Sequence, residues 1–300
     1  MKIDDFRKSK NIEDRRGQSS GGYSGGSAGS GMLLQLLLSR TGWKTKLIIL
    51  ILLFVIGGSG FSGILTGGNT SNPYQSANIT TTSDLEVSDE DADFVSKVFA
   101  STEDYWDQTF KDEGLTYQAP TLVLYTGSTQ TGCGTGQASS GPFYCSADKK
   151  VYLDLSFYEE LSTKYGAAGD FAMAYVIAHE VGHHVQNELG TMSAYHKKYQ
   201  SLSEKDANAL NVRLELQADY YAGAWANYVQ GEGLLEEGDF EEAMTAAHAV
   251  GDDHLQKEAY GKTYPDSFTH GTSEQRKRWF NRGFEYGDIE HGDTFSASSL

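Results

Sequence analysis

The sequence predicts an α+β fold, in which a small sheet packs on several helices and one transmembrane helix precedes them. Two short segments have the composition or alternation of β-strands, and several longer segments have the pattern of helices. One stretch near the N-terminus is apolar and uncharged. A short sheet beside several helices is typical of the α+β class. We therefore expect residues 88–290 to form the folded domain and residues 291–300 to form a C-terminal tail.

Residues 1–46 are expected to be a tail in the cytoplasm. This segment carries nine Lys or Arg residues and four acidic ones, a net charge of +5, whereas the whole chain stands at −17. Residues 17–31 are rich in Gly and Ser, which is typical of a flexible linker. Residues 32–38 are mostly Leu, which fits either a short helix on the inner membrane surface or a contact with a partner.

The stretch Leu47–Gly67 is expected to be a transmembrane helix that attaches the chain to the cell membrane. It contains no charged residue, and a bilayer span needs about 20 predominantly apolar residues. Lys44 and Lys46 precede it, and no Lys or Arg follows until Lys97. The positive-inside rule then puts the N-terminus in the cytoplasm and the domain outside, as a single-pass protein. A cleaved signal peptide is the alternative, but the preceding segment is long for one. The polar residues 68–87 would form an outer stalk.

The acidic charge of the domain argues against nucleic acid as a partner. Because the first 46 residues carry +5 and the chain carries −17, the remainder carries −22. Phosphates would be repelled by such a surface. The simplest interpretation is that this charge keeps the domain soluble.

The first half of the domain is predicted to be a helix followed by two strands. Large apolar residues recur at helical spacing from about Ser88 to Gly114. Thr121–Tyr125 has the composition of a strand, and Val151–Leu155 alternates as a half-buried strand does.

A Gly-, Ser- and Thr-rich segment, Gly127–Gly141, lies between these strands and is expected to be a loop. It holds Cys133, and Cys145 follows it; the chain has no other cysteine. With the domain outside the cytoplasm, a disulfide between the two is the favoured state.

The second half of the domain is predicted to be helical. The last of these helices opens with Thr272 and Gln275 in the spacing of a capping box. The expected helices are Asp170–Leu189, Ser203–Val229, Asp239–His254 and Thr272–Phe284.

The helix expected at 170–189 carries the motif H-E-x-x-H. His179 and His183 are four residues apart and therefore share a helix face, where two imidazoles can bind one Zn²⁺. Glu180 follows the first histidine, where it can take a proton from a metal-bound water. Two histidines on a solvated face are the alternative, but residues 172–178 are apolar, and burying these groups without a metal would be costly.

The next long helix offers the third ligand. A catalytic zinc usually has three protein ligands and one open position. Glu215 is the expected third ligand, and Asp219, one turn further, is expected to accept a hydrogen bond from a ligand histidine. The alternative is that both are surface acids.

Two further histidines have positions of interest. His184 lies off the face of His179 and His183, so we interpret it as supporting the site or packing. His270 precedes Gly271 at the start of the last helix and is a candidate for stabilising an oxyanion. A capping and packing role for this segment is equally compatible with the sequence. The other histidines, His196, His248, His254 and His291, are expected at the surface.

These residues together resemble the family described as putative neutral zinc metallopeptidases, which are bacterial membrane proteins. The resemblance covers most of the chain outside the linkers, and the combined motifs are far more specific than H-E-x-x-H alone. Its motifs are NIEDRRG at 11–17, CG at 133–134, GPFYC at 141–145, VYLDLSF at 151–157, HEVGHHVQ at 179–186, RLELQAD at 213–219 and HGTSEQR at 270–276. Ser146 departs from the proline that the family often has, at a position that touches no chemistry.

The resemblance implies a zincin-like metallopeptidase fold, with His179, His183 and Glu215 as zinc ligands and Glu180 as the base. The implied substrate is a peptide or protein. In zincins the strand before the active helix often lies at the edge of the cleft, and we predict that Val151–Leu155 is that strand. The Cys133 loop would then border the cleft.

Two alternatives to a peptidase stay open. One is a catalytically inactive zinc-binding interaction protein of the cell envelope, against which the presence of Glu180 weighs. The other is amidase-type hydrolysis of a substrate that is not a peptide.

Overall fold

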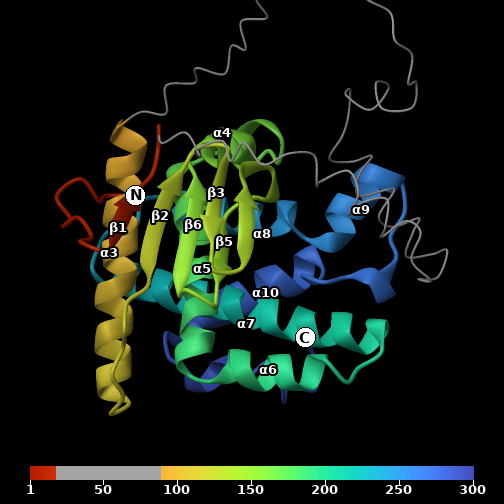
Figure 1. Cartoon of the computed structure of the whole chain (residues 1–300). Helices are drawn as coiled ribbons and strands as arrows, with labels where there is room; N and C mark the ends of the chain where they lie inside the picture. Colours follow the sequence, from red (N-terminus) through yellow and green to blue (C-terminus); the bar gives the residue numbers. More distant parts are fainter. Residues whose placement is uncertain (18–88) are drawn as a thin grey trace, which may run out of the picture. The chain divides into compact units, whose positions relative to one another are not determined.

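The computed structural model describes residues 1–17 and 89–300, which form the α+β domain that the sequence predicts (Figure 1). The strands are β1 Ile12–Asp14, β2 Thr121–Tyr125, β3 Ser128–Thr131, β4 Gly134–Gln137, β5 Phe143–Cys145 and β6 Lys150–Asp154. The α-helices are α3 Asp89–Asp112, α4 Ser156–Thr163, α5 Asp170–Glu188, α6 Thr191–Tyr199, α7 Glu204–Gly231, α8 Asp239–Ala249, α9 Asp252–Tyr260 and α10 Ser273–Tyr286. Short 3₁₀ turns lie at Ala138–Ser140, Pro265–Ser267 and Glu290–Gly292.

The main sheet has four strands in the order β1-β2-β6-β5. β1, β2 and β6 run parallel, and β5 pairs antiparallel with β6. Leu122 and Leu124 of β2 and Leu153 of β6 belong to the main core, whereas Val123 of β2 packs on the opposite face of the sheet. The sheet is therefore covered on both faces along its central strands.

Helix α5 lies behind the sheet in Figure 1 and contacts both the sheet and α7. Helices α7 and α10 also pack against each other at very short range. A Cβ atom added at Gly223 of α7 would come within 1.9 Å of the Phe280 carbonyl oxygen, and one added at Gly283 of α10 would come equally close to the Tyr220 carbonyl oxygen. Glycine is required at both positions, and this contact holds α7 in place behind α5.

The expected helices and strands are present, with two differences. Residues 127–141 are not a plain loop, because β3 and β4 form an antiparallel hairpin there. The helix expected at 239–254 is two helices, α8 and α9, which are separated at Gly251. A Cβ atom at Gly251 would meet the Ser273 backbone nitrogen at 2.5 Å, so the break lets the start of α10 approach. The capping box at Thr272 and Gln275 is formed as predicted.

The folded domain is larger at both ends than the expected range 88–290. Residues 1–17 belong to it, since β1 pairs with β2 and the Ile3 side chain is 2% exposed within the core. At the C-terminus, the Arg213 guanidinium donates to the backbone carbonyls of Thr294 and Ala297. A strand of three residues that includes Glu13 and Asp14 has too little pattern to be recognised in the sequence.

The linker expected at 17–31 beyond its first residue, the Leu-rich segment at 32–38, the membrane helix at 47–67 and the stalk at 68–87 lie outside the described residues. Within residues 1–17 and 89–300, no helix combines the length and the hydropathy that a bilayer span requires.

Candidate metal centre

The three expected ligands come together where α5 crosses α7. His179 and His183 lie one turn apart on α5, and their Nε2 atoms are 3.3 and 3.5 Å from the same oxygen, Oε2 of Glu215 on α7. One ligand atom from each residue lies within 4.8 Å of the others. The structure thus gathers two imidazole nitrogens and one carboxylate oxygen around a single point.

The close approach of the two helices depends on Gly182, inside the H-E-x-x-H motif. A Cβ atom at this position would lie 3.0 Å from the carbonyl oxygen and 3.2 Å from the Cα atom of Ala218. Ala218 stands between Glu215 and Asp219 on α7. The absence of a side chain at Gly182 therefore lets α7 bring Glu215 to the histidines.

Asp219 fixes the orientation of His179. The Nδ1–H of His179 donates to Oδ1 of Asp219 at 2.9 Å, which leaves Nε2 as the nitrogen with a free lone pair. Asp219 is fully buried, and it also accepts two hydrogen bonds from the Arg276 guanidinium and one from the Tyr175 hydroxyl. Burial opposes its charge, but Arg276 and His179 hold the pKa of Asp219 at about 2, so the carboxylate is ionised.

Gln186 fixes the orientation of His183 in the same way. The Nδ1–H of His183 donates to Oε1 of Gln186 at 2.9 Å, and the Gln186 amide group donates to the Leu214 carbonyl of α7 at 2.7 Å. Gln186 is fully buried. The roles of Gln186 and Arg276 were not predicted from the sequence. The one sequence feature that pointed to Gln186 was its position, three residues after His183.

The donor set fits a zinc ion. Both Nδ1 atoms donate to buried acceptors, so both Nε2 atoms face Glu215, where each can bind a metal ion in place of a proton. Burial alone would raise the pKa of Glu215, but His183 and His179 hold it well below its usual value, so the third ligand is anionic. Two imidazoles and one carboxylate are a known ligand set of catalytic zinc, which keeps a fourth position open.

Glu180 lies beside these ligands. Its side chain is 8% exposed, and burial raises its pKa above the ordinary value. The backbone N–H of Tyr144, in the middle of β5, faces its carboxylate and partly offsets this rise in pKa. Glu180 is therefore a buried acid held between the metal ligands and the edge strand of the sheet.

Strand β5 is anchored to α5 by a second contact. The Nε2–H of His184 donates to the Gln118 carbonyl at 2.6 Å, so its Nδ1 accepts the hydroxyl hydrogen of Tyr144 at 3.0 Å. Burial lowers the pKa of His184, which favours this neutral form. His184 thus lies off the metal face, as expected, and supports the strand that contacts Glu180.

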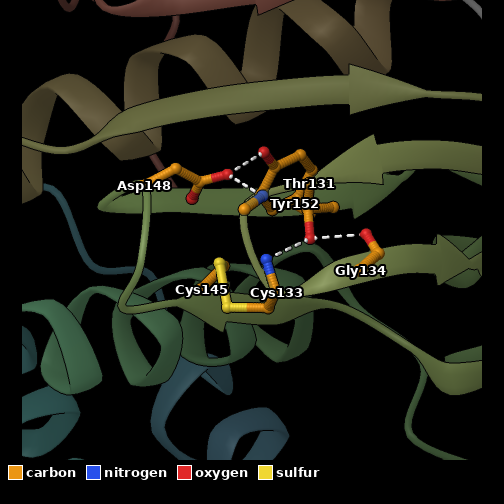
Figure 2. The surroundings of a disulfide bond; sticks show 7 residues. Thr131, Cys133, Gly134, Cys145, Asp148 and Tyr152 are labelled. Atoms are coloured by element: carbon orange, nitrogen blue, oxygen red, sulfur yellow. Dashed lines mark hydrogen bonds between the residues drawn. A yellow bond between two sulfur atoms is a disulfide. The ribbon is translucent and has the colours of Figure 1, made fainter.

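The disulfide between Cys133 and Cys145 is confirmed and ties the β3–β4 hairpin to the end of β5 (Figure 2). Next to it, Oδ2 of Asp148 accepts hydrogen bonds from the Gly132 backbone N–H and the Tyr152 hydroxyl. These contacts join the hairpin, β5 and β6 into one layer.

A cleft of about 480 Å³ opens at the metal ligands. Strand β5 borders it and is the edge of the sheet, whereas β6, the strand expected at this edge, lies between β2 and β5. The prediction for 151–155 was therefore wrong, because the antiparallel return of β5 covers β6. Residues 139–141, rather than Cys133 itself, form the part of the expected loop that lines the cleft.

His270 also lines the cleft. Oδ2 of Asp252 accepts the backbone N–H groups of Thr269, His270 and Gly271 at 2.6 to 3.0 Å, and Oδ1 lies 3.6 Å from the His270 ring. Burial opposes its charge, but Asp252 and Glu215 raise the pKa of His270. Of the remaining histidines, His196 and His248 are exposed, and His254 and His291 are half-buried.

The fold and the site together define a class of protein. Its members have an α+β domain in which two helices supply two histidines and a glutamate. The profile of the family described as putative neutral zinc metallopeptidase matches residues 1–295, and the chain belongs to this family.

Several relatives are similar over most of their length. The uncharacterised protein YpfJ of Escherichia coli (strain K12) is 48% identical over 294 residues, which is 97% of this chain and 98% of YpfJ. The uncharacterised protein Rv2575 of Mycobacterium tuberculosis (strain H37Rv) is 43% identical over 195 residues, 61% of this chain and 65% of that protein. No solved structure matches the chain.

Proposed function

We propose that this protein is a zincin-like, zinc-dependent peptidase that hydrolyses peptide bonds outside the cytoplasm. The observation that carries the proposal is the convergence of His179, His183 and Glu215 beside the buried carboxylate of Glu180. A site with a purely structural metal has no use for such a carboxylate.

In this mechanism His179, His183 and Glu215 hold the zinc ion. When bound, zinc supplies Lewis-acid polarisation of the scissile carbonyl and lowers the pKa of water. Glu180 accepts the proton of the attacking water and passes it to the leaving amine. Its raised pKa suits both steps, because a more basic carboxylate takes up the proton more readily and can then deliver it to the amine.

His270 is proposed to stabilise the negative charge that develops on the carbonyl oxygen. Asp252 holds its backbone through three hydrogen bonds and faces its Nδ1 side, so Nε2 is the nitrogen that can donate into the cleft. The raised pKa of His270 favours the protonated, donating form.

Strand β5 is proposed to bind the substrate backbone. It is the edge of the four-stranded sheet, it borders the cleft, and an extended peptide can add to such an edge through main-chain hydrogen bonds. The hydrogen bond between Tyr144 and His184 and the disulfide anchor this strand, so it can stay in position when a peptide binds.

Attachment to the cell membrane through 47–67 and a location of the domain outside the cytoplasm are part of the proposal. The apolar, uncharged composition of 47–67 supports the attachment. The Cys133–Cys145 disulfide supports the location, since such bonds persist in oxidising compartments.

The test compares the full-length native protein with Glu180→Gln, both purified in detergent and assayed for zinc. Each is incubated with a mixed peptide library, and cut sites are read by mass spectrometry. We expect the native protein to cut and the zinc-loaded variant to lose about 10²- to 10⁴-fold of the rate. Chelation should abolish cutting, and added zinc should restore it. If both proteins hold zinc and neither cuts, the inactive envelope-protein alternative replaces the peptidase.

A further inference from the structure

One wall of the cleft is apolar, and it begins on the active helix itself. Val176 lies one turn before His179 on α5 and lines the cleft. Every other side chain from Phe171 to Ala178 is buried, whereas Val176 is half-buried. The one apolar side chain that this stretch leaves partly open therefore lies beside the metal ligands.

Other elements contribute apolar side chains to the same cleft. Phe157 of α4 lines the cleft with its ring 6.3 Å from that of Tyr165, and it backs the chain at Gly141, where an added Cβ atom would lie 3.4 Å from the Phe157 ring. Leu255 of α9 lines the cleft and is half-buried. Val176, Phe157, Tyr165 and Leu255 are called the apolar wall below.

Besides the candidate metal ligands, two cationic side chains line the cleft, His270 and Arg276, and both already face carboxylates. Nε and Nη2 of Arg276 donate to Asp219 and Nη1 donates to the Val250 carbonyl, whereas the His270 ring lies beside Asp252. Glu160 is an acid, and Lys164 lies 3.8 Å from it one turn further along. An acidic side chain placed here would meet carboxylates and apolar surface.

We propose that the apolar wall binds a bulky apolar side chain of the substrate, at the residue next to the scissile bond. This inference rests on the proposed peptidase function and names the substrate class of its site: peptides with Leu, Phe or a similar residue at that position. Burial of such a side chain is favourable in proportion to its apolar area, whereas Asp would lose its hydration without a partner.

The test uses peptides that differ only at one residue flanking the cut site, with Leu, Phe, Ala or Asp there. With the native full-length protein, kcat/KM should be about 10- to 200-fold higher for Leu or Phe than for Asp. The zinc-loaded Glu180→Gln protein should show the same order in peptide binding, measured by fluorescence anisotropy. Equal kcat/KM for all four peptides would overturn the proposal.

Separate measurements of binding and cutting distinguish a failure of this proposal from a failure of the proposed function. If Glu180→Gln prefers Leu and Phe but the native protein cuts nothing, the apolar wall stands and the peptidase function fails. If neither form distinguishes the peptides, the apolar wall fails. Leu255→Lys should remove the preference and improve Asp peptides, whereas Leu115→Lys, at a 49% exposed leucine on the loop before β2, should leave the preference unchanged.

A different observation concerns the first 17 residues. Ile3 is buried in the core, and the Ser9 hydroxyl and the Asn11 amide both donate to Glu103 of α3. Glu13, in β1, accepts from Lys150 of β6 at 2.6 Å. These contacts run along the segment and tie it to α3, to β6 and to the core.

We infer that residues 1–17 and residues 89–300 lie on the same side of the membrane. A single crossing at 47–67 with the N-terminus in the cytoplasm would put them on opposite sides and leave the β2 edge and its apolar surroundings uncovered.

Two single-cysteine variants test this inference in the full-length chain. Lys8→Cys reports on the N-terminal segment and Tyr260→Cys on the domain, because both side chains are more than half exposed. The native cysteines are paired and do not react with maleimides. In intact spheroplasts, an impermeant maleimide should label both variants. Labelling of one and protection of the other would overturn the inference. Protection of both would uphold the shared side and instead contradict a domain outside the cytoplasm.

Discussion

Each histidine ligand owes its orientation to a buried residue that also reaches α7. Asp219 belongs to α7 and holds His179, whereas Gln186 belongs to α5, holds His183 and bonds to the Leu214 carbonyl. The ligand set is thus locked by hydrogen bonds between the same two helices that carry it.

Replacing Gln186 tests this lock. In Gln186→Leu the Nδ1–H of His183 loses its acceptor, and we expect zinc affinity to fall about 10- to 100-fold. The metal-free protein should lose about 1–3 kcal/mol because the Leu214 carbonyl loses its donor. Competition with a fluorescent chelator measures the affinity. Gln230→Leu, at an exposed position near the end of α7, is the control; equal affinity in both variants would show that Gln186 does not orient the ligand.

Glu13 gives the pairing of β1 a dependence on pH. Hydrogen bonds from Arg15 and then from Lys150 lower the pKa of Glu13 from 4.5 to about 2. A carboxyl whose pKa is lower in the folded state stabilises the fold above its unfolded pKa, and this contribution is lost as the pH falls toward 2.

We therefore expect Glu13→Gln to be less stable than the native protein at pH 6, by about 0.2–1 kcal/mol, the range for partly exposed ion pairs. The difference should shrink at pH 3. Urea unfolding at both pH values checks this, beside Glu237→Gln at an exposed position before α8. A difference for Glu13→Gln that is as large at pH 3 as at pH 6 would contradict the assignment.

Among the elements, the crossing of α5 and α7 decides whether a metal site exists. Gly182 permits this crossing, since a Cβ atom there would lie 3.0 Å from the Ala218 carbonyl oxygen. The two middle positions of H-E-x-x-H are not restricted to one residue type by the motif. In this chain, however, Gly182 at one of them faces the backbone of α7.

Gly182→Ala should therefore push the helices apart by a few tenths of an ångström. We expect stability to fall by about 1–3 kcal/mol from overpacking and zinc affinity to fall at least tenfold, since Glu215 retreats from the histidines. Gly231→Ala is the matched control, because Gly231 ends α7 with no atom near its added Cβ. Thermal unfolding measures the change in stability of both variants, and zinc titration measures the change in affinity. Unchanged zinc binding in Gly182→Ala would mean that the two helices can accommodate the added methyl group without displacing Glu215.

Much of the helical frame could be predicted from the sequence, because the long helices α5, α7 and α10 carry strong periodic or capping signals. That His179 and His183 share a face could be predicted for the same reason, because residues four apart on a helix do so wherever the helix lies. The structure brings Glu215, the predicted third ligand, to the same point. Gln186 and Arg276 were missed because a polar residue gives no sign of burial until its partners from other helices are known. Short strands such as β1 and β5 depend on pairing with distant residues rather than on local pattern.

For the whole molecule, the N-terminal segment is a component of the core rather than an extension of it. Ile3 is 2% exposed among residues of the main core, although about 70 residues of chain separate this segment from α3.

Ile3→Ala tests this role. We expect the free energy of unfolding of the full-length protein to fall by about 2–5 kcal/mol, as for other buried Ile-to-Ala changes. Leu115→Ala, at a 49% exposed position, should change it by less than about 0.5 kcal/mol. Denaturant titration in detergent compares the two. Equal effects would show that the segment contributes nothing to stability.

The pairing of β1 with β2 also determines the order in which the molecule can assemble. Ile12 pairs with Leu122, far along the chain, so β1 has no partner until β2 has been made. Parallel pairing over such a separation must first overcome the entropy of closing a long loop, which slows folding. Strand β1 is thus synthesised first and docks late, and the apolar edge of β2 stays uncovered in the meantime, when a chaperone or a neighbouring chain can reach it.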